Sequence, residues 1–147
     1  MSPTPPAGWE QRAAAAVDRG RRVDRFIPGI LLDSPLSRLG WLYGTFVGWV
    51  WGAIWSRGRI ERHGSLWVFR GLPEWAFGRG GTCVGACFLT GERAPDDRVL
   101  RHEAVHERQW RRYGMLMPLL YLIAGRNPLT NRFEIEAGLA DGNYVPR

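Results

Sequence analysis

The sequence predicts an α+β fold, in which a mostly helical domain lies beside a small β-sheet. Residues 65–70 (SLWVFR) and residues 82–90 (TCVGACFLT) resemble strands in composition, and glycines bound the second segment. The last third of the chain instead contains apolar and amphipathic stretches with helix start and stop signals. We therefore expect a small sheet within residues 60–90, packed next to a few helices.

The length of the chain, 147 residues, suits one domain with a single core. We divide it into residues 1–26, a tail followed by a surface helix, and residues 27–147, a single domain. The formal net charge is +6, and a basic chain favours nucleic acid or anionic membrane as a partner. The arginines are scattered, however, and the absence of lysine fits a GC-rich genome. We therefore expect no specific nucleic-acid partner.

The first residues carry no apolar segment of the secretory type. Residues 1–8 are proline-rich and predict a disordered tail, so we expect a cytoplasmic protein. Residues 9–26 combine an alanine run with several arginines, which indicates a short surface helix that ends at Pro28 and Gly29. The sequence leaves the oligomeric state open.

An uncharged segment, residues 39–56, lies between Arg38 and Arg57. It contains four tryptophans, and its glycines recur at every fourth position, which places them on one side of a helix: Gly40, Gly44, Gly48 and Gly52. Each glycine costs a helix about 1 kcal/mol relative to alanine, so close contact must compensate. Two interpretations stay open. The segment contacts or spans a membrane, or it packs within a soluble core.

The later helices have recognisable ends. Asp96 or Asp97 caps a helix that runs to about Tyr113, where Gly114 stops it. Residues 115–124 form an apolar helix that tolerates Pro118 near its first turn. A last helix starts at Asn131, with Glu134 placed as in a capping box, and Gly142 closes it.

The helix between residues 97 and 113 contains the motif HEAVH. In a helix, His102 and His106 lie on one face, one turn apart, and can bind a single metal ion. Glu103 lies beside that ion and can act as a general base that takes a proton from water. A catalytic zinc site needs three protein ligands and one open position, so a third ligand must come from elsewhere.

The third ligand is expected on the last helix. Glu134 and Glu136 are two residues apart and point about 200° away from each other, so only one can face the metal. If Phe133 and Ala137 pack inward, Glu134 flanks that face and Glu136 turns away. We favour Glu134 and keep Glu136 as the alternative third ligand.

The stretch HEAVHERQWRRYG followed by NRFEIEAG resembles the HExxH…E arrangement of gluzincin-type zincins, and small bacterial proteins with HExxHxxQ and a late FExxA. The resemblance covers about the last third of the chain. It implies zinc as the cofactor, His102, His106 and Glu134 as ligands, and Glu103 as the base. Many gluzincins continue as ExxAD, where the aspartate orients a ligand histidine. Here glycine follows the alanine, so Gln109 or Asp141 must orient the ligands.

Other reactive residues receive structural interpretations. Cys83 and Cys87 are too few for a disulfide scaffold. Within one strand they would be about 13 Å apart, too far for a shared disulfide or ion, so we expect small core residues on one strand face. His63 lies in a charged segment and is expected to be exposed, and Tyr113 is expected in the core.

The sequence therefore predicts a zinc-dependent hydrolase, a peptidase of the HExxH…E type. Residues 82–90 would receive an extended peptide substrate by main-chain pairing. The alternative is a non-catalytic metal-binding or membrane-associated module. The two differ in the fourth metal position, which a hydrolase keeps open toward a groove and a structural site closes.

Overall fold

The computed structural model describes residues 4–146 and has an α+β fold. Of the expected tail, residues 1–3 lie outside the described residues, and residues 4–8 form no regular helix or strand. The described helices are α1 (Trp9–Phe26), α2 (Pro35–Trp55), α3 (Asp97–Tyr113), α4 (Leu116–Ala124) and α5 (Arg132–Ala137). The strands are β1 (Ile60–His63), β2 (Leu66–Phe69), β3 (Thr82–Val84) and β4 (Cys87–Leu89).

The four strands form one mixed sheet in the order β1-β2-β4-β3. β2 and β4 are parallel, and both outer pairs are antiparallel. The prediction of one strand over residues 82–90 was wrong, because the segment folds into the β3–β4 hairpin. Gly85 allows the tight turn, since its φ of +60° lies in a region that residues with a Cβ rarely adopt.

This hairpin also corrects the placement of the two cysteines. Cys83 pairs with Phe88, and Cys87 pairs with Val84, so the two thiols point to opposite faces of the sheet. Cys83 lies toward α3, with its Sγ 3.8 Å from the Glu103 carbonyl oxygen, and Cys87 lies toward α2. Both are free thiols, and burial is the main cause that raises the pKa of each.

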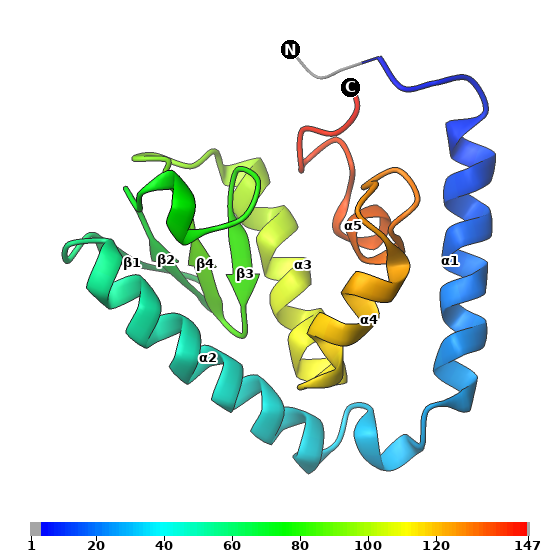
Figure 1. Ribbon diagram of the computed structural model, residues 1–147, viewed down its shortest axis with the longest axis horizontal. Helices are drawn as coiled ribbons and strands as arrows, with labels where there is room; N and C mark the ends of the chain where they lie inside the picture. The colour runs from blue at the N-terminus through cyan, green and yellow to red at the C-terminus, as the bar shows by residue number, and fades with distance from the viewer. Residues whose placement is uncertain (1–3, 147) are drawn as a thin grey trace.

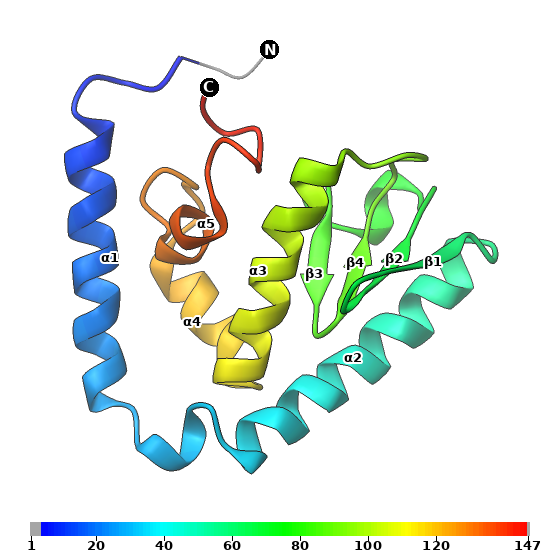
Figure 2. The same ribbon diagram turned by 180° about the vertical axis from the view of Figure 1, so that it is seen from behind.

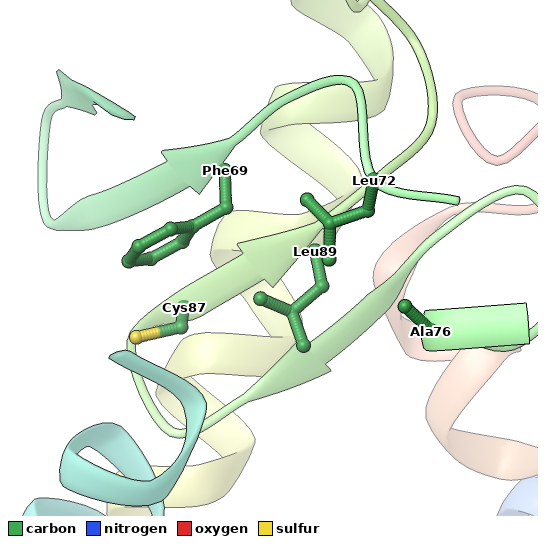
Figure 3. Packing of buried hydrophobic residues seen from close by; sticks show 5 residues of the cluster. All are labelled: Phe69, Leu72, Ala76, Cys87 and Leu89. Carbon is green, nitrogen blue, oxygen red and sulfur yellow. The ribbon is translucent and has the colours of Figure 1, made fainter. Parts of the chain in front are cut away.

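The sheet lies between α2 and α3, with an apolar cluster on each face. The cluster toward α2 contains Phe69, Leu72, Ala76, Cys87 and Leu89, and Figure 3 shows these side chains converging. The cluster toward α3 contains Leu66, Val68, Phe88 and Leu100. The side chains of alternate residues in β2 and β4 therefore point to opposite faces of the sheet, as the pleat of a strand requires.

The glycines of the uncharged segment line the buried side of α2, as the periodicity predicts. A Cβ built on Gly44 would lie 2.9 Å from the Trp110 ring, and one on Gly52 would lie 2.4 Å from Phe69. The close-contact partners are thus α3 and the sheet of the same chain. The helix begins before the uncharged segment, at Pro35, because Ser34 and Ser37 form a capping box. No helix among residues 4–146 is both long enough and apolar enough to cross a membrane.

The remaining helices cover the side of α3 that faces away from the sheet. Figures 1 and 2 show α4 and α5 on that side, with α1 beyond them at the far edge of the molecule. α1 has the predicted bounds and is fixed to α5 by an ion pair of 2.8 Å between Asp24 and Arg132. Residues 1–26 therefore include a helix that is attached to the rest of the chain by side-chain contacts.

Both ends of α3 were predicted correctly, whereas for α5 only the start at Asn131 was. Asp96 caps α3 through a hydrogen bond from the Arg98 amide, and Gly114 ends the helix. α5 stops at Ala137, well before Gly142, because Gly138 adopts a φ of +98°. The Asn131 side chain caps the amide of Phe133, so the expected capping box with Glu134 does not form.

Candidate metal centre

The two histidines of the HEAVH motif meet on the buried face of α3. Their Nε2 atoms are 3.1 Å apart, and the ring centroids are 4.7 Å apart. Both side chains are buried, with exposed fractions of 2% for His102 and 7% for His106. The spacing of four residues thus brings both rings to one point, as the helical periodicity predicts.

Each ring is oriented by a hydrogen bond from its Nδ1 atom. His102 Nδ1 lies 3.0 Å from the Gly138 carbonyl oxygen, and His106 Nδ1 lies 2.8 Å from Gln109 Oε1. A carbonyl oxygen only accepts, and the Gln109 amide nitrogen is engaged as a donor to Phe133 O at 3.0 Å. These contacts place a proton on both Nδ1 atoms, so when both rings are neutral their Nε2 lone pairs face one another, and a charged ring carries a second proton at Nε2.

Glu134 supplies a third acceptor at the same point. Its Oε2 lies 3.1 Å from His102 Nε2, and its Oε1 lies 3.5 Å from His106 Nε2. One ligand atom from each of the three residues fits within 4.8 Å of the others. The Tyr121 hydroxyl donates to Glu134 Oε1 and holds the carboxylate in place.

Charge balance at this point favours a positive charge. Burial would raise the pKa of Glu134, but its hydrogen bonds with His102 and His106 outweigh burial and lower it. Burial would lower the pKa of His106, yet the hydrogen bond and charge of Glu134 raise it, with the charge of Glu103. The cluster is thus most stable when a positive charge lies between the carboxylate and the imidazoles. A proton or a metal ion can supply that charge.

The other acidic candidates lie outside this cluster. Glu136 is exposed and accepts a hydrogen bond from the Gln109 amide at 3.4 Å, so α5 presents Glu134 to the histidines. Asp141 forms an ion pair with Arg101 at 3.5 Å, outside the cluster. Of the two residues expected to orient the ligand histidines, Asp141 is therefore not the one that does so. Gln109 and the Gly138 carbonyl orient the two rings. His63 is exposed on β1, and Tyr113 is buried.

Glu103 is adjacent to the cluster but does not join it. Its side chain is buried, and its Oε2 atom has no hydrogen-bond partner among the described residues. Burial is the main cause that raises the pKa of this carboxyl group, while the two histidines oppose the shift. A buried carboxylate without a partner is costly unless a ligand or water completes its hydrogen bonds.

A cavity of about 950 Å³ opens over the cluster. The side chains of His102, Glu103, His106 and Glu134 line it, with β3, the start of α4 and the loop at residues 78–81 as further walls. The residues that line the cavity include exposed ones, among them Arg79, Leu122 and Arg126, so the cavity connects the cluster to the protein surface. Most of the other wall side chains are apolar or aromatic, which suits a binding site for an organic ligand.

Two tyrosines of the site were missed by sequence reasoning. Tyr121 lies on α4, where the apolar run indicated only a core helix. Tyr144 lies on the C-terminal segment, with its ring centroid 6.0 Å from that of His102. Burial, followed by the charge of Glu134, raises the pKa of Tyr144, so its hydroxyl stays protonated. No periodic pattern marks either tyrosine, because loops and chain reversals bring them to the site.

The cluster fits a zinc ion in its chemistry. Two imidazole nitrogens and one carboxylate oxygen are the donor set of many catalytic zinc sites, and an ion held by these three residues would keep a fourth position for a small ligand. The engaged Nδ1 atoms give both rings the orientation that a metal ligand requires. Comparisons of the chain with protein-family models, with curated proteins and with solved structures found no match.

Proposed function

We propose that the protein is a zinc-dependent hydrolase, a peptidase, with His102, His106 and Glu134 as the metal ligands. One observation carries the proposal. Two imidazole Nε2 atoms and a buried carboxylate converge on one point at the wall of a large cavity, and each imidazole ring is oriented there by a hydrogen bond through its Nδ1 atom. Next to that point lies Glu103, a carboxylate whose Oε2 has no partner among the described residues.

The chemistry divides between the ion and the chain. A bound zinc ion supplies a Lewis acid that polarises a substrate carbonyl and makes water more acidic. Glu103 takes the proton from the attacking water and delivers it to the leaving amine, which its position outside the ligand set allows. The Tyr144 hydroxyl is protonated and close to His102, so it can donate to the oxygen on which negative charge develops.

The proposed substrate is an extended peptide. β3 is an edge strand of the sheet, and its residues Thr82, Cys83 and Val84 all line the cavity. A peptide added alongside β3 would pass over the cluster and could be held by main-chain hydrogen bonds. The apolar walls, which include Phe88, Trp110 and Met117, favour apolar side chains next to the cleaved bond. The opening to the surface favours this function over a closed, non-catalytic metal site.

Metal content tests the ligand set. The purified protein should carry close to one zinc ion per chain, and His102→Ala or His106→Ala should lose it. Glu134→Gln should weaken binding more strongly than the matched control Glu136→Gln, because Glu136 is exposed and outside the cluster. Unchanged metal content in both histidine variants, or a larger effect at Glu136, would overturn the assignment.

Activity tests the role of Glu103. A peptide library identifies a substrate, and Glu103→Gln should then retain zinc and lose about 10²–10⁴-fold in kcat, the contribution of a general base. Retention of the metal separates loss of the base from loss of the site. Activity that survives this substitution would contradict the mechanism, and a zinc-loaded protein that cleaves no library member would favour a non-catalytic metal module.

A further inference from the structure

The outward surface of α2 is apolar from Leu36 to Ile54, apart from Arg38 near its start. Its large side chains are exposed at fractions between 38% and 66%, in contrast to the buried glycines on the opposite side. They are Leu36, Leu39, Leu42, Tyr43, Phe46, Val47, Trp49, Val50, Trp51 and Ile54, and we call them the α2 apolar face. A soluble monomer seldom exposes so large a continuous apolar surface without a binding role.

The geometry of α2 fixes how this face is presented. Gly40 packs against Met115 and Gly114, and Gly52 packs against Phe69 and Leu89, so both halves of the helix are held against the body. The α2 apolar face therefore runs lengthwise along one edge of the molecule, as Figure 1 shows for the helix itself. A partner must be broad and flat, or itself an elongated apolar element.

The charges within α2 and in the loop that follows it are all positive. Between Asp33 and Glu61 the chain contains Arg38, Arg57 and Arg59 and no acidic residue. Arg38 lies near the start of α2, and Arg57 and Arg59 follow its end, all of them exposed. A second copy of the chain is disfavoured, because pairing of two α2 helices in either direction brings arginine near arginine. An anionic surface instead satisfies all three charges.

Tryptophans gather at the C-terminal half of the face. Trp51 forms edge contacts with Trp55 and with Trp75, whose side chain is 63% exposed. The indole Nε1 of Trp51 donates to the Ala76 carbonyl oxygen at 2.8 Å, which fixes the orientation of a ring that is 40% exposed. Indole rings are favoured at the boundary between lipid headgroups and acyl chains.

We propose that α2 lies flat on an anionic lipid bilayer, with the α2 apolar face inserted at the boundary of headgroups and acyl chains. The apolar side chains supply the burial, and the three arginines bind lipid phosphates and anionic headgroups at both ends of the helix. The proposal stands on α2 alone and does not depend on metal binding or hydrolysis.

Vesicle co-sedimentation of the full-length protein tests the proposal. The protein should sediment with vesicles of phosphatidylcholine and phosphatidylglycerol, and more weakly with phosphatidylcholine alone. Replacing Arg38, Arg57 or Arg59 by glutamine should weaken binding to the anionic vesicles by about fivefold each. Equal binding to both vesicle types would contradict the role of the arginines, and no binding at low salt would overturn the proposal.

A pair of matched variants assigns the binding to α2. Phe46→Ser with Ile54→Ser removes two exposed side chains of the face, and Leu119→Ser with Ile123→Ser removes two similarly exposed side chains of α4. Circular dichroism should show both variants folded. The α2 pair should lose vesicle binding and the α4 pair should keep it. The reverse pattern would overturn the proposal, because it would show that another surface binds lipid. A dimer that forms without lipid and that the α2 substitutions dissociate would also overturn it, because a second copy would then cover α2.

Discussion

At the residue scale, the two histidine rings are held by acceptors of different kinds. His106 is held by the Gln109 side chain, which also donates to the Phe133 carbonyl of α5, so one amide links the HEAVH helix to the helix that carries Glu134. His102 is held by the Gly138 backbone carbonyl. The end of α5 therefore contributes both a candidate ligand and the group that orients another one.

Gln109 should influence metal affinity without being a ligand. Gln109→Ala removes the acceptor of His106 Nδ1 and should weaken zinc binding by about 10–100-fold, the usual effect of losing a group that orients a ligand. Asp141→Asn is the control, because Asp141 pairs with Arg101 outside the cluster. Competition with a chromophoric chelator measures both affinities. Equal affinities for the two variants would contradict the assigned role of Gln109.

At the element scale, the glycine repeat of α2 lets this helix pack closely against both α3 and the β3–β4 hairpin. A Cβ on Gly48 would lie 3.0 Å from both the Cys87 Cβ and the Val84 carbonyl oxygen, and one on Gly40 would lie 2.6 Å from the Met115 amide. The absence of side chains at these positions lets the helix contact α3 and the β3–β4 hairpin directly. The hairpin in turn forms one wall of the cavity over the cluster.

Gly48→Leu should therefore destabilise the fold. Overpacking costs about 1–3 kcal/mol, and a leucine between two backbones belongs at the upper end of that range. Removing a helical glycine returns about 1 kcal/mol, which leaves a net loss of about 2 kcal/mol. Val47→Leu, on an exposed neighbour, should change stability by less than about 0.5 kcal/mol. Urea unfolding compares the two, and equal midpoints would show that the glycine contact is unimportant.

Local patterns in the sequence predicted the elements whose signals are periodic or capped. The spacing of His102 and His106, the glycine repeat and the caps Asp96 and Gly114 each act within a few residues, and the structure has them as predicted. The β3–β4 hairpin was missed because a single glycine, Gly85, makes its turn within an otherwise strand-like apolar segment. Conformations set by one residue leave little trace in composition or periodicity.

At the scale of the whole molecule, α1 is fixed to α3 and α5 by a buried polar network. Asp24 accepts from Arg132 at 2.8 Å and from the Tyr113 hydroxyl at 2.7 Å. The Arg132 side chain is 6% exposed, and its guanidinium also donates to the Tyr113 oxygen at 2.6 Å. The two contacts of Asp24 join residues that are far apart in the sequence, 108 positions for Arg132 and 89 positions for Tyr113. No pattern in the sequence could have predicted them.

Removal of the acid from this network should be strongly destabilising. Asp24→Ala leaves the Arg132 charge buried without its carboxylate, and such a loss typically costs about 3–5 kcal/mol. Asp18→Ala, at an exposed position of the same helix, should leave stability nearly unchanged. Chemical denaturation followed by circular dichroism gives both values. A similar small effect for the two variants would mean that α1 contributes little to the folded state.

The anomalous scattering of zinc tests the central claim most directly. Crystals of the protein grown with equimolar zinc, measured on both sides of the zinc absorption edge, should show one strong anomalous peak. The account predicts that it lies about 2.0–2.2 Å from the Nε2 atoms of His102 and His106 and from a carboxylate oxygen of Glu134. Glu103 should lie outside the ligand set. A peak bound by other residues, or no peak between these three side chains, would contradict the account.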